Sequence, residues 1–395
     1  MALLDRRRAG VGIAHRSCRR WLFLSANVRQ QSAVRFSAVG TWHAGTHCRL
    51  GRHYVVTVAV PTSNPSEGWL TYAPVRAELR VVERLLLDIG GPDDFASEVC
   101  THLVRAGGKR LRPALVLLAA SFGRDSRRDA IPIAVGVELI HLASLYLDDV
   151  MDESTSRRGA DSANAKWGNV NAVLAGQYLL AKGTELICSG GKELAAGLAR
   201  TTESLWRGQM REAAAAYNLD QEVSALLETI HLKTGSLYEF ACQAGAVVGR
   251  VGPDETEALC EFGSKLGTMF QLVDDVLDLV AQKPQLGKPP GTDLVEGIYT
   301  MPVAITLAGK TSGGERLRRV LGRGKPGSSQ LQEAIELLKS NRSISMTMYV
   351  AADIANEALL TTDSLPRGAA RDSLRALVDF LLNRAAGSMA VGLDP

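Results

Sequence analysis

The sequence predicts an all-α domain that extends from about residue 67 to residue 395. Apolar residues recur at i, i+3, i+4 and i+7 over most of this region, which is the period of a helix with one buried face. Strand-type alternation is nearly absent, and clusters of glycine and proline separate the periodic segments. Hydrophobic residues make up 46% and charged residues 22% of the chain, which favours a globular over a disordered protein.

The expected helices follow the periodic segments in order. They cover residues 75–87, 94–106, 113–122, 130–152, 169–188, 194–217, 221–248, 254–280, 301–307, 330–338, 344–360 and 369–382. Segment 254–280 is apolar nearly all round, so we expect it in the centre of the fold. Loops are expected at residues 107–108, 249–253, 284–291, 309–314 and 322–329.

Residues 1–66 differ from the rest in composition. They hold ten arginines, no lysine and one acidic residue, Asp5, and residues 61–68 read as a linker. A start codon assigned too far upstream, a disordered basic tail and an arginine-rich transit peptide all fit this composition. We expect residues 1–66 to be an extension or a mis-assigned start, and residues 67–395 to form the functional domain.

The charge, the cysteines and the hydropathy of the chain indicate in which cellular compartment the protein is expected. A net charge of +3 excludes neither nucleic acid nor a membrane surface. The six cysteines are scattered without a CxxC pair, which suits reduced thiols in the cytosol. We find no uninterrupted apolar run of about 20 residues, the length that spans a bilayer. The expectation is a soluble, cytoplasmic protein with no transmembrane segment and no nucleic-acid partner.

An aspartate cluster ends the apolar segment 130–152. Asp148 and Asp152 lie one helical turn apart on the same face, with Asp149 beside them. Aspartate is a poor helix former, and carboxylates this close repel each other unless a cation lies between them. Mg²⁺ fits because it takes oxygen ligands from one or two carboxylates and from substrate phosphates. A solvated helix end is the competing interpretation of one such cluster.

A second cluster repeats the spacing. Asp274, Asp275 and Asp278 lie within a helix that is otherwise apolar. Because buried carboxylates without partners are costly, two such clusters favour a shared cavity that contains metal. The chain is therefore expected to be a magnesium-dependent enzyme that acts on diphosphates.

Basic residues supply the other half of a diphosphate site. Residues 107–113 (GGKRLRP) place three cations on a glycine turn before a helix, where free N–H groups favour anions. Arg157 and Arg158 follow the first cluster, and an arginine fork holds phosphate oxygens in pairs. Lys233 lies on an apolar helix and Lys288 in a loop, and each taken alone is more readily explained as a surface charge. No nucleotide-binding glycine loop is present, so phosphoryl transfer from ATP is not indicated.

Five ordered strings resemble the trans-isoprenyl diphosphate synthase (polyprenyl synthetase, geranylgeranyl diphosphate synthase-like) family. They are GGKRLRP (107–113), DDVMDESTSRRG (148–159), KTGSLYEFACQAGA (233–246), FQLVDDVLD (270–278) and GKPPGTDLVEGIYTMP (287–302). The resemblance implies a bundle of long helices around a deep central cavity (the isoprenoid synthase fold), usually as a homodimer. It implies a magnesium-dependent head-to-tail (1′-4) condensation of isopentenyl diphosphate with dimethylallyl, geranyl or farnesyl diphosphate.

The resemblance also implies residue roles. About three Mg²⁺ ions would be held by the clusters, with Asp148, Asp149, Asp152, Asp274 and Asp278 as metal ligands, and Asp275 completing the catalytic set. Arg157, Lys233 and Lys288 would contact the allylic diphosphate, and Thr234 and Gln271 would lie near its reacting carbon. Gly108, Lys109, Arg112, His141 and Arg158 would hold isopentenyl diphosphate.

Two positions depart from the family pattern, and two others bear on product length. Leu147 stands where the family often has His and Gln177 where it usually has Asp, which bears on turnover or on a need for a partner subunit. Ala143 and Ser144 are small and precede Asp148 by about one turn, where the family builds the floor of its elongation pocket. We therefore expect products of C20 or longer, unless a deeper residue such as Leu139 closes the floor. Close helix packing is the competing explanation for these small residues.

Two other functions stay open from the sequence. A class I terpene cyclase also uses DDxxD and magnesium, but its second metal motif is of an Asn/Ser/Glu type and it lacks the GGKRLRP pocket. A non-catalytic regulatory subunit of a prenyl synthase usually loses one aspartate cluster, whereas this chain keeps both.

Overall fold

The computed structural model describes residues 68–91, 94–124, 127–280, 290–309, 311–322 and 324–392. All of them belong to one unit, Val60–Pro395. The extension predicted for residues 1–66 and the expected ligand Lys288 lie outside the described residues.

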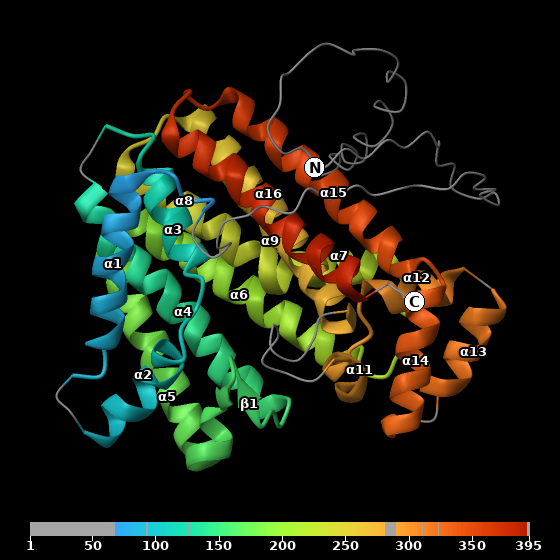
Figure 1. The fold of residues 1–395 in the computed structure, drawn as a ribbon. Helices are drawn as coiled ribbons and strands as arrows, with labels where there is room; N and C mark the ends of the chain where they lie inside the picture. Colours follow the sequence, from blue (N-terminus) through green and yellow to red (C-terminus); the bar gives the residue numbers. More distant parts are fainter. Residues whose placement is uncertain are drawn as a thin grey trace, which may run out of the picture. The chain divides into compact units, whose positions relative to one another are not determined.

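The described residues form helices almost throughout, which confirms the predicted all-α class (Figure 1). The α-helices are α1 (Ala73–Leu87), α2 (Phe95–Arg105), α3 (Leu111–Ala120), α4 (Ala130–Met151), α5 (Ala163–Cys188), α6 (Lys192–Ala214), α7 (Val223–Ile230), α8 (Ser236–Gly249), α9 (Pro253–Val280), α11 (Thr292–Glu296), α12 (Met301–Ala308), α13 (Ser312–Leu321), α14 (Ser328–Ser340), α15 (Ser343–Thr361) and α16 (Ala369–Gly392). A two-stranded antiparallel hairpin, β1 (Ser156–Arg157) and β2 (Ala160–Asp161), follows the first aspartate cluster.

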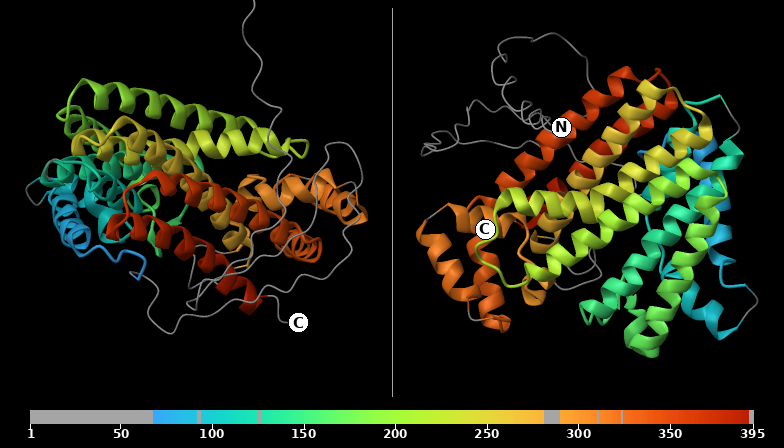
Figure 2. Two further views of the ribbon diagram at one scale, coloured as in Figure 1. Left: turned by 90° about the horizontal axis from the view of Figure 1, so that it is seen from above. Right: turned by 180° about the vertical axis from the view of Figure 1, so that it is seen from behind.

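Helices α4 and α9, which carry the two aspartate clusters, lie inside the bundle. α4 packs against α3, α5 and α8, and α9 packs against α8, α15 and α16. Figure 2 shows α6, α8 and α9 running side by side, with the C-terminal helices α15 and α16 next to α9. From Phe262 onward α9 has no exposed residue, so the predicted central position of this helix is confirmed.

Glycines allow α4 and α5 to approach each other closely. A Cβ atom added to Gly183 would lie 2.8 Å from the carbonyl oxygen of Gly136. Among the described residues, α4 alone is long and apolar enough to cross a membrane by length and composition, yet 67% of its most apolar stretch is buried inside the fold. This is the pattern of a core helix.

The structure corrects several predicted boundaries. α5 contains a break at Gly168, where φ is +81° and ψ is 160°, so a short helical segment from Ala163 precedes the predicted helix 169–188, which starts directly after the break. The predicted helix 221–248 contains a π-helical turn, His231–Gly235, between α7 and α8. The sequence prediction missed α13, whose first turn contains the helix-disfavouring residues Gly313 and Gly314.

Candidate active site

The first aspartate cluster ends α4 and divides into two kinds of carboxylate. Asp149 is completely buried and accepts hydrogen bonds from Arg157 through Nε at 2.8 Å, with Nη2 at 2.5 Å from the same Oδ1 atom. Asp148 is partly exposed, and Asp152 caps the helix with its N–H donating to the Asp148 carbonyl at 2.8 Å. The middle aspartate therefore anchors the hairpin, and the outer two remain partly accessible.

The second cluster on α9 divides in the same way. Asp275 is 2% exposed and accepts a hydrogen bond from Gln271 Nε2 at 2.9 Å. Burial, together with the carboxylates of Asp293 and Asp274, holds the pKa of Asp275 well above its ordinary value against the lowering effect of the Gln271 hydrogen bond. Asp274 and Asp278 are partly exposed. Each cluster therefore presents its first and third aspartates and buries its second.

The π-helical turn joins the two clusters. Lys233 Nζ lies 2.5 Å from Glu212 Oε1 and 3.8 Å from Asp148 Oδ2. The adjacent residue, Thr234, donates a hydrogen bond from Oγ1 to Gln271 Oε1 at 3.1 Å. Two consecutive residues of this turn therefore contact different helices: Lys233 approaches α4 and Thr234 contacts α9. Single π-helical turns are frequent at functional sites.

Charge is concentrated around this turn. Burial, then the carboxylates of Asp148 and Glu296, raise the pKa of Asp152 to about 6. Burial alone would lower the pKa of Lys233, but Asp148 and Glu212 raise it above its ordinary value, so the ammonium stays charged. Glu212 was missed by the sequence prediction. Its position on α6 three residues after the buried Gln209 indicates that it faces inward.

The three basic residues of the turn at residues 107–113 have different surroundings. Arg110 adopts a left-handed conformation (φ +49°) and turns inward, where it forms ion pairs with Glu83 at 2.6 Å and Glu138 at 3.1 Å. Arg112 stacks over the ring of Tyr238, with Cζ 4.4 Å from the ring centroid. The Nε of Arg112 is buried and has no hydrogen-bond partner among the described residues. Arg112 therefore keeps a donor for an anion, whereas Arg110 is structural.

Arg158 and His141 complete this cationic pocket. Arg158 donates to the carbonyl oxygens of Leu103, at 3.0 Å, and Gly107. Gly108 lies close to both arginine forks, because a Cβ atom built on it would be 2.6 Å from Arg110 Nη1 and 2.9 Å from Arg158 Nη1. Burial and then the nearby arginines, Arg112 first, hold the pKa of His141 well below its ordinary value, so its imidazole is neutral at pH 7.

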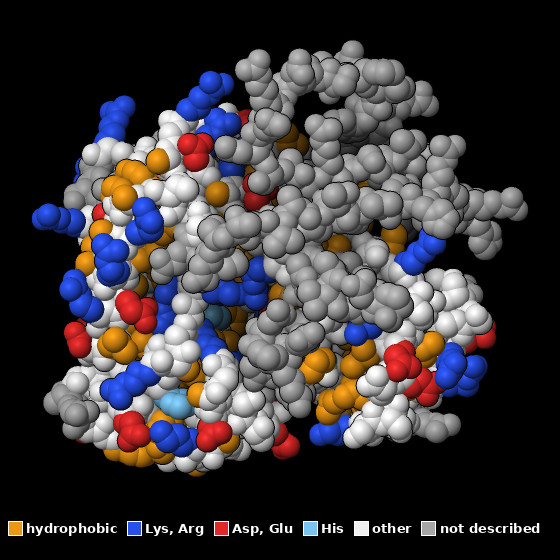
Figure 3. Space-filling model, viewed as in Figure 1, with side chains coloured by type: hydrophobic (Ala, Val, Ile, Leu, Met, Phe, Trp, Pro, Cys, Tyr) orange, Lys and Arg blue, Asp and Glu red, His pale blue; other side chains and the backbone are white. Residues whose placement is uncertain are grey.

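A fourth cation comes from the C-terminal helix. The pKa of Lys109 is lowered to about 8, mainly by burial and next by the positive charge of Arg384 on α16. Asp274 raises this pKa, and Arg158 lowers it by less than Arg384 does. The sequence prediction missed Arg384, although its spacing from the buried residues Leu377 and Leu381 places it on the inner face of α16. Figure 3 shows lysine and arginine side chains gathered around a hollow near the centre of one face.

The two departures from the family pattern lie near each other. Gln177 is exposed on α5. A Cβ atom on the neighbouring Gly176 would lie 3.3 Å from Leu147 Cγ, so Leu147 packs against this part of α5. Neither residue forms a hydrogen bond or ion pair with either aspartate cluster among the interactions that the described residues show.

The fold and the site together define the structural class of this protein. An all-α bundle whose buried helices present two aspartate clusters beside a lysine, with a separate cationic pocket close by, is the isoprenoid synthase fold. Within the described residues, no three His, Cys, Asp or Glu side chains lie close enough to hold a metal ion by themselves. The partly exposed carboxylates of the outer aspartates are oxygen donors of the kind that hard divalent cations take.

Comparisons with known proteins identify the family. The model of the polyprenyl synthetase family matches residues 93–338. Nonaprenyl diphosphate synthase from Mycobacterium tuberculosis is 37% identical over 314 residues, which cover 79% of this chain and 94% of that protein. Heptaprenyl diphosphate synthase component 2 from Geobacillus stearothermophilus is 35% identical over 315 residues, 79% of this chain and 95% of that protein.

Solved structures agree with this result. The structure of polyprenyl synthase from Caulobacter crescentus, complexed with calcium and isoprenyl diphosphate, matches with a TM-score of 0.75 and 33% identity over 79% of this chain and 96% of that one. The chain belongs to the polyprenyl synthetase family, and it is a prenyltransferase.

Proposed function

We propose that this protein catalyses the magnesium-dependent head-to-tail (1′-4) condensation of isopentenyl diphosphate with an allylic diphosphate, and that its product is C20 or longer. The observation that carries the proposal is the π-helical turn: Lys233 pairs with Asp148 at 3.8 Å while Thr234 bonds to Gln271, one turn before Asp275. This turn lies between the two aspartate clusters. The separate cationic pocket of Lys109, Arg112 and Arg158 can bind the second diphosphate.

Metal would be held by the partly exposed aspartates, as about three ions on the allylic diphosphate. The direct ligands in this proposal are Asp148, Asp152, Asp274 and Asp278. Asp149 and Asp275 belong to the same clusters, but both are buried and accept hydrogen bonds from protein side chains. This suits a role in holding the helix segments that carry the two clusters in place. When bound, Mg²⁺ supplies Lewis-acid stabilisation of the negative charge on the leaving diphosphate.

The allylic substrate ionises next to Lys233. Cleavage of the C–O bond leaves an allylic cation and a diphosphate, and the ammonium of Lys233 stabilises the diphosphate because its raised pKa keeps it charged. Lys288 is proposed to add a second cation. Arg157 contributes through its ion pair with Asp149 and through its charge beside the site. The dipoles of Thr234 and Gln271 face the carbon that becomes positive.

Isopentenyl diphosphate occupies the other cationic pocket. Arg112 offers its unpartnered Nε, and Lys109, Arg158 and neutral His141 offer further N–H donors. Held there, the terminal double bond attacks the allylic cation and forms the new C–C bond. A proton then leaves the resulting cation, and the departing diphosphate is the base. Apolar helix faces exclude water that would otherwise quench the cation.

Product length depends on the residues before Asp148. Ala143 is 1% exposed, and its carbonyl oxygen lies 3.4 Å from a Cβ built on Gly176 of α5, which supports helix packing as the reason for this alanine. Ser144 is partly exposed and donates to the His141 carbonyl at 2.8 Å. Leu139 is completely buried. Ser144 is therefore the residue on which the proposal of a C20 or longer product rests.

A cytoplasmic homodimer is the proposed form of the enzyme. α5 exposes Val170 (71%), Leu174 (61%) and Tyr178 (39%) at helical spacing, an apolar stripe that suits burial against a second copy. The cysteines among the described residues are free thiols, which suits a reducing compartment.

A product assay tests the proposal. Purified protein is incubated with Mg²⁺, labelled isopentenyl diphosphate and farnesyl diphosphate, and the products are sized. We expect products of C20 or longer that require isopentenyl diphosphate, and no product from an Asp148→Ala, Asp274→Ala variant. Products formed from farnesyl diphosphate alone would indicate a cyclase, and absence of activity without a second subunit would indicate a regulatory component.

A further inference from the structure

Arg112 in the cationic pocket lies against an aromatic ring rather than a carboxylate. Its guanidinium is placed over the ring of Tyr238 on α8, with Cζ 4.4 Å from the ring centroid. The described residues show no ion pair for Arg112, whereas Arg110 of the same basic string has two. After burial, the charges of Arg112 and Arg158 are the main causes that lower the pKa of His141, so these cations lie near each other. An attraction that involves no carboxylate therefore holds Arg112 among other cations.

The ring of Tyr238 is itself fixed by its surroundings. Tyr238 is completely buried, and its ring packs against that of Phe270 on α9, with 5.6 Å between the centroids. A Cβ atom built on Gly267 would lie 2.9 Å from Cβ and 3.1 Å from Cδ2 of Tyr238, so the ring has little room to move. Phe270 precedes Asp274 by one turn of α9. Tyr238 therefore links Arg112 on α3 to the helix that carries the second aspartate cluster.

The hydroxyl group of Tyr238 contributes little to this arrangement. Its Oη atom is buried and has no hydrogen-bond partner among the described residues. Burial raises the pKa of Tyr238 to about 12, although the charge of Arg112 opposes this shift, so the phenol is neutral at pH 7. The attraction to Arg112 is therefore that of a cation to the electron-rich face of an aromatic ring, which is stronger when the pair is shielded from water.

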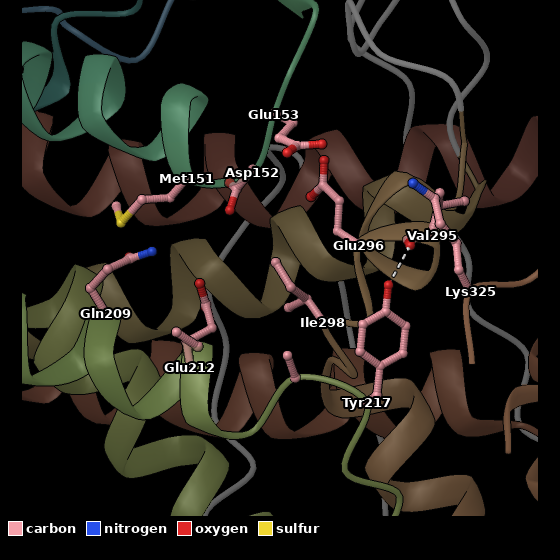
Figure 4. Close-up of a pocket in the computed structure, with 12 residues that line it drawn as sticks. Met151, Asp152, Glu153, Gln209, Glu212, Tyr217, Val295, Glu296, Ile298 and Lys325 are labelled. Carbon is pink, nitrogen blue, oxygen red and sulfur yellow. Dashed lines mark hydrogen bonds between the residues drawn. The ribbon is translucent and has the colours of Figure 1, made fainter. Parts of the chain in front are cut away.

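The charges around the active site determine where a diphosphate without metal can bind. The cavity at the ends of α4 and α6, which Figure 4 shows, is lined by the carboxylates of Asp152, Glu153, Glu212 and Glu296. Lys325 is the one lysine or arginine among its described lining residues, so this cavity repels a diphosphate. The pocket around Arg112 contains several cations instead, and it is the better site for isopentenyl diphosphate.

We propose that Tyr238 positions Arg112 for the diphosphate of isopentenyl diphosphate, because its ring holds the guanidinium while the N–H groups of Arg112 stay available. A carboxylate partner would occupy these donors, and the diphosphate would have to displace it. A ring against the face of the guanidinium occupies none of the donors in its plane. The buried Nε of Arg112, which has no hydrogen-bond partner among the described residues, agrees with this arrangement. Arg112 is thus ordered before the substrate binds, and less conformational entropy is lost on binding.

The affinity for isopentenyl diphosphate tests the proposal. It is measured by isothermal titration calorimetry on the full-length protein without metal or an allylic substrate, so that no turnover occurs. Tyr238→Leu should weaken binding about tenfold, because the cation–π attraction is lost and one long side chain must then be ordered on binding. Tyr238→Phe keeps the ring and loses only the unpartnered hydroxyl, so its affinity should stay within about twofold of wild type.

A double-mutant cycle separates the positioning of Arg112 from general damage to the core. In an Arg112→Met background, Tyr238→Leu should cause no further loss of affinity, because Tyr238 acts through Arg112. Phe240→Leu is the matched control. Phe240 is a buried aromatic residue of the same helix, but it lies against α6, where a Cβ atom on Gly197 would be 2.9 Å from Phe240 Cε2. This variant should lower the melting temperature as Tyr238→Leu does and leave the affinity unchanged.

A fluorinated ring tests the proposal even if Tyr238→Leu does not fold. Replacement of Tyr238 by trifluorophenylalanine keeps the shape of the ring but withdraws electrons from its face, so it should weaken binding about threefold or more relative to Tyr238→Phe. The proposal is overturned if the fluorinated ring or Tyr238→Leu binds isopentenyl diphosphate like wild type. It is also overturned if Tyr238→Phe weakens binding as much as Tyr238→Leu, or if the loss persists in the Arg112→Met background.

The inference rests on the proposed function for its ligand, but the two fail separately. Prenyl transfer is measured as product formed by the wild-type protein, and this affinity is measured without turnover. A wild-type protein that binds no isopentenyl diphosphate would contradict both. A wild-type protein that forms product, together with a folded Tyr238→Leu variant of unchanged affinity, would contradict only the role of Tyr238.

Discussion

Arg157 holds the buried carboxylate of Asp149 with two nitrogens, Nε at 2.8 Å and Nη2 at 2.5 Å from one oxygen. The preceding residue, Asp148, faces the other way and approaches Lys233 at 3.8 Å. Two adjacent aspartates of one motif therefore differ in environment. One fixes the end of α4 to the hairpin, and the other is accessible to a ligand.

This difference predicts unequal effects of the two aspartates on stability. Asp149→Asn should lower the free energy of unfolding by about 3 kcal/mol, because it leaves a largely buried arginine without its counter-charge. Asp148→Asn should change it by less than about 1 kcal/mol, because Lys233 keeps Glu212 as a partner. Urea denaturation without metal or diphosphate measures both. Equal losses in the two variants would contradict this division of roles.

Gly208 sets the approach of α6 to the π-helical turn. A Cβ atom there would lie 2.5 Å from the backbone nitrogen of Lys233, and backbone has little room to move. Gly208→Ala should therefore cost about 1–3 kcal/mol of stability and reduce activity by displacing Lys233. Gly309→Ala is the control, because its nearest contact would be an ordinary 3.5 Å. Thermal unfolding and steady-state rates compare the two, and similar effects would exclude the close approach as the cause.

The chain of hydrogen bonds from Thr234 through Gln271 to Asp275 predicts a kinetic effect. Gln271→Met keeps the approximate volume but removes both hydrogen bonds, at 3.1 and 2.9 Å. We expect kcat to fall at least tenfold and stability to fall by about 1–3 kcal/mol, since buried Asp275 loses a donor. Thr234→Val should lose activity but little stability. A Gln271→Met variant with wild-type kcat would remove Gln271 from the proposed site.

The lowered pKa of Lys109 predicts that the KM for isopentenyl diphosphate depends on pH. Burial and then Arg384 lower its pKa to about 8, so the ammonium is charged below pH 8 and loses its proton as the pH rises. The KM for isopentenyl diphosphate should therefore increase by up to about tenfold between pH 7 and pH 9.5, since one charged hydrogen bond is lost. Lys109→Arg stays charged and should give a flat profile. A wild-type rise that persists in Lys109→Arg would assign the effect to another group.

Product length should respond to position 144 rather than 143. Ser144→Phe places a large ring one turn before Asp148 and should shorten the main product to C15. Ala143→Phe should instead destabilise the fold by about 1–3 kcal/mol, because that residue is 1% exposed beside α5. Product sizing and thermal unfolding of both variants separate these effects. An unchanged product from folded Ser144→Phe would place the floor elsewhere.

The sequence by itself determined the all-α class, the central position of α9, both aspartate clusters and the basic turn. Helical periodicity and charge pattern are local properties, so they are visible in a linear chain. Kinks and short helices were less visible. The π-helical turn at Lys233 lies within a continuous apolar pattern, and the first turn of α13 contains two glycines that argue against a helix.

Only the tertiary structure decided what each charged residue contacts. Arg110 and Arg112 are two positions apart in one basic string, yet Arg110 pairs with Glu83 and Glu138 while Arg112 keeps a free donor over Tyr238. The physical reason is that burial and ion pairing depend on residues distant in sequence. Glu212, brought to Lys233 by the packing of α6 against the π-helical turn, has a role that no local pattern could reveal.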